Sequence, residues 1–134
     1  MIPRYTRKEI SDIWQPTNKF NIWLKIELLI CEALAIKGHI PKKSLEIIKK
    51  KAKFNVNRID RIEEEVKHDV IAFLTNVGEN VGPDSRFIHK GVTSSDIIDT
   101  AYSIQLKQSS KIIRNGLKNL IKSLKSKALI FKNY

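Results

Sequence analysis

Apolar residues recur along this chain at steps of three and four positions, the spacing that puts side chains on one face of an α-helix. No segment shows the alternation of apolar and polar residues that is typical of a half-buried strand, so the pattern predicts an all-α fold. One helix is predicted over residues 17–37, closed by Gly38 and Pro41. Its apolar face consists of Phe20, Trp23, Leu24, Glu27, Ile30, Cys31 and Leu34.

Shorter helices are predicted on both sides of this one. Thr6 and Glu9 fit a capping box, in which side chains satisfy the free N–H groups of a helix start, for a short first helix that Pro16 ends. A basic helix is predicted over residues 42–52, and another is capped by Asn55 and runs to residue 77. Polar residues 67–69 interrupt the surface pattern of the latter helix. A loop then follows, marked by Gly78, Gly82 and Pro83.

The longest helix is predicted to begin near Ser94, where Thr93 and Asp96 fit a second capping box. Its apolar stripe continues for about forty residues, or ~60 Å at ~1.5 Å per residue. Such a helix must project from a compact domain of this size, so its distal apolar positions need partners from elsewhere. Residues 132–134 supply neither a glycine cap nor a proline stop, so we expect the chain to be a fragment of a larger helical protein.

Length and composition narrow the class of protein. The 134 residues allow one ordinary domain. No segment resembles a signal peptide, and no apolar run approaches the ~20 residues of a membrane span, so no membrane partner is expected. The single cysteine, Cys31, excludes a disulfide framework and favours a reduced, cytoplasmic setting.

A net charge of +11 suggests a nucleic-acid-binding protein as one alternative. The excess is almost entirely lysine, spread over predicted helix faces without interleaved aromatic residues. The one local concentration is Lys49, Lys50, Lys51 and Lys53. This distribution favours solvated helix faces, so no nucleic-acid partner is expected.

Two clusters of polar residues contain side chains that could bind a ligand or transfer a proton. Arg4 and Tyr5 place a planar fork of donors beside a phenol, a pair that can hold a phosphate, although they also fit an ordinary polar terminus. Lys67, His68 and Asp69 include an imidazole that can donate, accept or carry a proton near neutral pH. The alternative for these three residues is an exposed polar turn.

A third cluster, residues 89–96, leads into the longest helix. Helix N-termini carry unpaired N–H donors and a partial positive charge, so they attract carboxylates and phosphates. Thr93 and Ser94 add hydroxyls at this point, and Gly91 permits backbone geometry that other residues avoid. Capping of the helix is the alternative role, but it leaves N–H groups free for an anion. The histidines lie at no metal-ligand spacing, so no metal site is predicted.

Together, the three clusters resemble the N-terminal region of the adenylosuccinate lyase family, within the fumarase/aspartase superfamily. Residues 4–7 (RYTR) resemble the family's opening motif, residues 67–73 (KHDVIAF) its helix-opening motif, and residues 89–96 (HKGVTSSD) its HxGxTSxD segment. The last motif alone indicates only the superfamily, since cycloisomerase relatives carry similar versions. All three in this order are specific to the family, and the match covers the whole chain.

The resemblance implies a fold and an assembly. Residues 1–92 would form the N-terminal helical domain, and residues 93–134 the start of the first long helix of a central bundle domain. Enzymes of the superfamily are homotetramers in which three subunits contribute to each active site. The bundle would supply the missing partners of the projecting helix.

The resemblance also implies a reaction. The family releases fumarate by β-elimination of a C–N bond from adenylosuccinate, giving AMP, and from the succinylated imidazole-carboxamide ribonucleotide of purine biosynthesis. It uses no metal or organic cofactor. The general-acid histidine and the general-base serine lie downstream of the region matched here, so the chain alone is expected to be inactive.

Site roles carry over residue by residue. Arg4 and Tyr5 would hold the phosphate end of the nucleotide. Lys67, His68 and Asp69 would line the nucleotide, with His68 supporting the catalytic histidine.

The third motif would bind the other end of the substrate. Thr93 and Ser94 would hydrogen-bond a carboxylate of the succinyl part, and His89 would border the phosphate region. Two alternative hypotheses about function remain open: a helical oligomerisation module without catalytic activity, and a basic nucleic-acid-binding domain. The module explains the long helix but not the first two clusters.

Overall fold

The computed structural model describes residues 2–133 of the protein, and every regular element in that range is helical. The all-α fold predicted from the sequence is therefore confirmed for the described residues. In chain order the elements are the 3-10 helix η1 (Pro3–Tyr5), the α-helices α1 (Lys8–Ile13), α2 (Pro16–Ile36), α3 (Lys42–Lys51), α4 (Val56–Val66) and α5 (Asp69–Val81), the 3-10 helix η2 (Pro83–Phe87) and the helix α6 (Ser94–Ile130).

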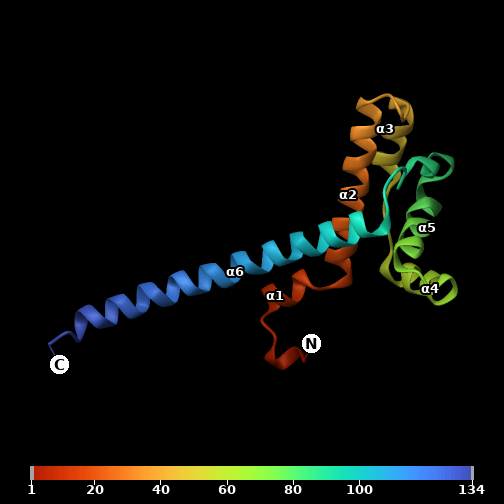
Figure 1. The fold of residues 1–134 in the computed structure, drawn as a ribbon. Helices are drawn as coiled ribbons and strands as arrows, with labels where there is room; N and C mark the ends of the chain where they lie inside the picture. The colour runs from red at the N-terminus through yellow and green to blue at the C-terminus, as the bar shows by residue number, and fades with distance from the viewer. Residues whose placement is uncertain (1, 134) are drawn as a thin grey trace.

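Helices α2 to α5 form a body from which the long helix α6 projects (Figure 1). Helix α2 packs against α3, α4 and α6, while α5 packs against α4, α3 and η2. Helix α1 lies alongside the proximal part of α6 (Figure 1). None of the helices in residues 2–133 is long and apolar enough to cross a lipid bilayer.

Aromatic rings form the centre of the body. Phe73 of α5 stacks on Phe20 of α2 with ring centroids 5.7 Å apart, and Trp23 meets Phe73 edge-on at 5.5 Å. Phe54, from the linker between α3 and α4, approaches Phe20 to 5.9 Å. Such stacked and edge-on pairs add to the gain from burying apolar area. The rings occupy positions of the apolar stripes, apart from Phe54, which lies in a linker.

Helix α6 is supported only along its first part. Its buried side chains recur at four-residue steps and are Ile97, Ala101, Gln105 and Ser109. Beyond Ile112, which is partly buried, its large apolar side chains are exposed, namely Ile113, Leu117, Leu120, Ile121, Leu124, Leu129 and Ile130. The predicted projection of this helix is therefore confirmed, and its distal stripe packs on no other described element.

The attachment of α1 to α6 uses polar groups. The amide of Gln105 donates to the carbonyl oxygen of Ile13 at 2.8 Å, and Asn18 of α2 donates to the same oxygen at 2.7 Å. These bonds satisfy a carbonyl at the end of α1 that has no partner within its own helix. The rings of Trp14 and Tyr102 also meet, with centroids 5.9 Å apart.

Two sequence predictions near the N-terminus are wrong. Helix α1 begins after Arg7, and the Thr6 hydroxyl donates to the carbonyl oxygen of Ile2 at 2.8 Å, so Thr6 and Glu9 form no capping box. Pro16 does not end α1 but opens α2, a position that suits its fixed φ and missing N–H group. The predicted capping box of Thr93 and Asp96 is confirmed, and the Asp96 carboxylate accepts the N–H of Thr93 at 2.8 Å.

The single helix predicted from Asn55 to residue 77 is also wrong, because two helices occupy this stretch. Lys67 adopts a left-handed conformation with φ of 54° and ends α4, and His68 is extended and caps α5. The apolar periodicity hid the break because Val66 and Val70 keep the four-residue step across it. Gly78, predicted in a loop, lies within α5, which Gly82 ends.

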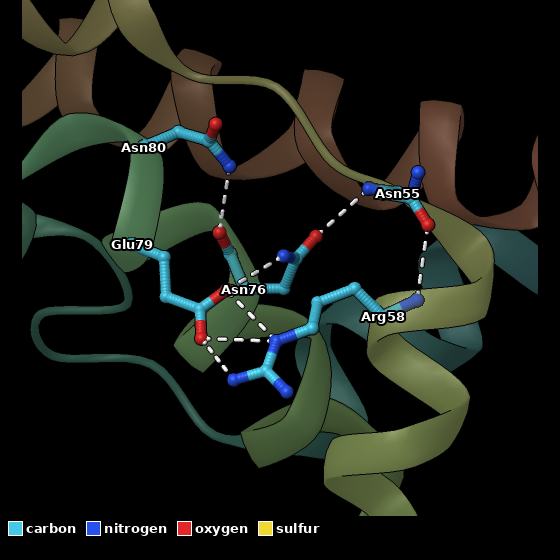
Figure 2. A network of polar contacts seen from close by, with 5 residues as sticks. All are labelled: Asn55, Arg58, Asn76, Glu79 and Asn80. Atoms are coloured by element: carbon cyan, nitrogen blue, oxygen red, sulfur yellow. Dashed lines mark hydrogen bonds and ion pairs between the residues drawn. The ribbon is translucent and has the colours of Figure 1, made fainter.

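A network of hydrogen bonds and an ion pair joins α4 to α5 (Figure 2). The buried Asn76 accepts the N–H of Asn55 at 2.8 Å and donates to the Glu79 carboxylate at 3.0 Å. That carboxylate pairs with the Arg58 guanidinium, with an Nη2–Oε1 distance of 2.6 Å. The hydrogen bond from Arg58, followed by that from Asn76, lowers the pKa of Glu79. Asn55 also caps α4 as predicted, accepting the N–H of Arg58 at 3.0 Å.

This network predicts that Asn76→Ala destabilises the protein by about 1–3 kcal/mol, because the side chain of the buried Asn76 no longer accepts the N–H of Asn55 or donates to Glu79. Urea unfolding followed by circular dichroism measures the loss. Thr75→Ala, a change on the exposed face of the same helix, is the control and should stay within about 0.5 kcal/mol of the parent. Equal midpoints for the two variants would contradict a structural role for Asn76.

Candidate functional site

The first candidate cluster lies on the surface in η1. The Arg4 guanidinium carbon sits 4.8 Å from the centroid of the Tyr5 ring, a cation–π contact within the cluster. Tyr5 is 74% exposed. Its phenol and the Arg4 guanidinium are thus open to an external ligand rather than packed in the body.

The second cluster forms the corner between α4 and α5. His68 Nδ1 accepts the N–H of Ile71 at 3.3 Å, and the Asp69 carboxylate accepts the N–H of Val70 at 2.7 Å. A neutral imidazole that accepts at Nδ1 carries its proton on Nε2. The corner therefore offers an Nε2–H donor on a half-exposed ring at the start of α5.

Lys67 faces a different environment. It lines an open pocket together with the acidic residues of α4, namely Asp60, Glu63 and Glu64. The left-handed backbone of Lys67 reverses the chain between α4 and α5, so Lys67 and His68 belong to different helix ends.

The third cluster is a tight turn followed by the start of α6. His89 and Gly91 both have positive φ, 63° and 78°. The turn brings Thr93 to the N-cap of α6 and Ser94 to its first position. The N–H groups of the first residues of a helix have no intrahelical partner, so those of Ser94 and Ser95 are available to an anion.

Sequence reasoning missed the residue that holds this turn in place. Glu27 of α2 is 1% exposed, and its carboxylate accepts the backbone N–H of His89 at 3.0 Å. Its other oxygen lies 2.6 Å from His89 Nδ1. The signal was a carboxylate on the apolar face of the predicted helix over residues 17–37, since a buried carboxylate requires partners. The partner could not be identified from spacing, because it lies far away in the chain.

Cys31, one turn further along α2, reinforces the same attachment. Its thiol donates to the carbonyl oxygen of Phe87 at 3.8 Å. Burial, and secondarily the charge of Glu27, raise the pKa of the Cys31 thiol to about 11. The thiol therefore stays protonated and serves as a donor, as its place in the predicted core stripe suggests.

The three clusters remain separate within one chain. Among residues 2–133, no hydrogen bond, ion pair or ring contact links η1, the α4–α5 corner and the start of α6. In the same range, no three side chains of His, Cys, Asp or Glu gather as metal ligands. The chain thus presents three polar surfaces rather than one closed pocket.

Comparison with known proteins places the chain among lyases. The model of a family described as "Lyase" matches residues 4–133. The adenylosuccinate lyase of Synechocystis sp. is 49% identical over 128 residues, and that of Bacillus subtilis is 43% identical over 128 residues. Each alignment covers 96% of this chain but 30% of the relative, so the chain spans less than a third of the length of these proteins.

Solved structures show the same fold at lower identity. A fumarate lyase from Mesorhizobium sp. BNC1 superposes with a TM-score of 0.80 at 20% identity, over 90% of this chain and 30% of that one. A β-carboxy-cis,cis-muconate cycloisomerase from Acinetobacter calcoaceticus gives 0.83 at 21% identity, over 92% of this chain and 31% of its own. The helical body and the projecting helix therefore recur together in other proteins.

The turn before α6 predicts opposite effects for two glycine replacements. Gly91→Ala should destabilise the protein by about 1–2 kcal/mol, because its φ of 78° is unfavourable for a residue with a Cβ, although no atom lies within 4 Å of that Cβ. Gly116→Ala, in an equally open position of α6 with ordinary helical φ, is the matched control and should raise helicity. Urea unfolding measures the change in stability of each variant, and the circular dichroism signal of the folded chain measures the change in helicity. If Gly91→Ala left the stability unchanged or raised it, the claim that this turn requires a glycine backbone would be wrong.

Proposed function

The chain belongs to the lyase family, and on that premise we propose that it forms the N-terminal part of an adenylosuccinate lyase. The similarity of nearly the whole chain to two enzymes of that name carries the proposal. The three motifs support it, because each supplies the kind of group that a succinylated nucleotide requires.

The proposed reaction is a β-elimination. A base removes the proton next to a carboxylate of the succinyl group, the C–N bond breaks, and an acid protonates the leaving nitrogen. The products are fumarate and either AMP or the imidazole-carboxamide ribonucleotide of purine biosynthesis. No metal or organic cofactor takes part. Negative charge accumulates on the carboxylate in the intermediate, so pre-placed donors lower the barrier.

Thr93 and Ser94 are proposed to bind that carboxylate. They stand at the N-terminus of α6, where the helix dipole and free N–H groups favour negative charge. In the capping box, the Asp96 carboxylate accepts the N–H of Thr93. The backbone N–H groups of Ser94 and Ser95 are left for the ligand. Donors fixed on a helix need no rearrangement as the charge develops.

The other two motifs are proposed to bind the nucleotide. Arg4 and Tyr5 are exposed and would hold the phosphate end. Lys67, His68 and Asp69 would line the nucleotide. The Nε2–H group of His68 would donate to the catalytic histidine, which lies downstream in the proposed enzyme.

Assembly would bring the separate clusters together. In the proposed homotetramer each active site draws on three subunits, so clusters that do not meet in one chain can meet between chains. The exposed distal stripe of α6 provides the apolar surface for the central bundle. We propose that residues 1–92 form the first domain and residues 93–134 the start of the bundle domain, in a cytoplasmic enzyme.

The proposal predicts that the 134-residue chain alone releases no fumarate from adenylosuccinate, because the general acid and base lie in later segments of the enzyme. The absorbance of fumarate follows the reaction, with a complete adenylosuccinate lyase as the positive control. Turnover above background would show that the chemistry resides within these residues.

A second prediction concerns Ser94 in the complete enzyme that contains this chain. Ser94→Ala should lower kcat about 10²–10³-fold, as expected for the loss of a donor to a developing anion, and change stability by less than about 0.5 kcal/mol. Ser103→Ala, an exposed serine further along α6, is the control and should leave kcat unchanged. Unaltered kinetics in Ser94→Ala would exclude Ser94 from the site.

A further inference from the structure

A buried carboxylate in α2 has both of its oxygens in contact with one distant residue. Glu27 is 1% exposed, and within residues 2–133 both of its oxygens contact His89, one the backbone N–H at 3.0 Å and the other the ring at 2.6 Å. Burying a charged group is unfavourable unless hydrogen bonds compensate for lost hydration. The position of Glu27 is therefore coupled to the position and ring orientation of His89.

The contact determines which ring nitrogen of His89 is occupied by Glu27 and which is not. An ionised carboxylate only accepts hydrogen bonds, so the Nδ1 atom facing Glu27 carries a proton. The distance of 2.6 Å matches a short, charge-assisted bond. This leaves Nε2 as the ring nitrogen that does not contact Glu27, on a side chain that is 18% exposed.

The same contact holds the backbone before α6. His89 has a φ of 63°, a conformation that residues with a Cβ adopt only when the surroundings impose it. The bond from its N–H to Glu27 and the bond from Cys31 to the Phe87 carbonyl fasten this turn to α2. Since the chain reaches Thr93 within four residues, Glu27 also anchors the start of α6.

We propose that Glu27 is a positioning residue of the substrate site. Through His89 it presents the Nε2 atom of that ring to the phosphate end of the nucleotide and holds the turn that leads to Thr93 and Ser94. The nature of the ligand rests on the proposed function, whereas the Glu27–His89 arrangement stands on the geometry alone.

Nitrogen NMR of the histidine rings tests the arrangement without reference to function. At alkaline pH a free imidazole is neutral and has one proton, and long-range ¹H–¹⁵N spectra identify the nitrogen that carries it. In the 134-residue chain, His89 should be protonated at Nδ1. His68, which accepts at Nδ1, should be protonated at Nε2, and the exposed His39 provides an internal reference. Protonation of His89 at Nε2 alone would overturn the proposal without any variant.

The variant Glu27→Gln sharpens this test. Glutamine keeps the shape and one acceptor oxygen for the N–H of His89, but its amide nitrogen can only donate to the ring. The proton of His89 should therefore move from Nδ1 to Nε2. Glu32→Gln removes the same charge from a surface position of α2 paired with Lys49, and should leave the His89 spectrum unchanged. A Glu27→Gln chain with the parental His89 spectrum would refute the positioning role.

Kinetics of the complete enzyme test the link to substrate. Glu27→Gln should raise KM for adenylosuccinate about tenfold with a smaller change in kcat, because a bond to the remote phosphate end acts similarly in the ground and transition states. The Glu32→Gln enzyme should keep parental values. Equal KM values in both variants would overturn the role of Glu27 in substrate binding. Absence of fumarate release by the parent enzyme would instead refute the proposed function and leave the NMR result intact.

Discussion

The burial of Glu27 on the apolar face of α2 is the constraint on which the candidate site depends. The same helix face carries Phe20 and Trp23 into the aromatic centre and, further along, turns Glu27 toward His89. Desolvating a carboxylate is unfavourable by several kcal/mol unless it is paired. The fold meets this requirement by bringing residues 62 positions apart into contact. Helix α2 thus connects the hydrophobic core to the turn from which α6 starts.

Helix ends, rather than helix faces, supply most of the candidate binding groups. His68 caps α5 through Nδ1, and Thr93 caps α6 together with Asp96. Capping satisfies some of the free N–H groups and leaves others pointing toward a potential anion. The network around Asn76 (Figure 2) supports this arrangement indirectly, because it joins α4 to α5. It thereby stabilises the corner between the two helices, which contains His68. In the proposed site, the same residues would therefore have both structural and binding roles.

The two parts of the long helix α6 are stabilised in different ways. Its first part is buried against α1 and α2, and Gln105 donates to the last turn of α1. Its distal part exposes an apolar stripe and depends on helix propensity and on whatever covers that stripe. A chain that spans less than a third of its curated relatives presents such a surface where, in the proposed assembly, other helices of the bundle would lie.

By itself, the sequence determined the all-α class, the starts of α4 and α6, the lone buried cysteine and the three polar clusters, because these follow from periodicity and local capping chemistry. It could not locate the break at Lys67, since Val66 and Val70 continue the helical spacing across it. Nor could it reveal the partner of Glu27. Local spacing specifies which face of a helix is apolar, whereas a contact between distant segments exists only once the helices have packed. Only the tertiary structure therefore decided which nitrogen of His89 contacts Glu27.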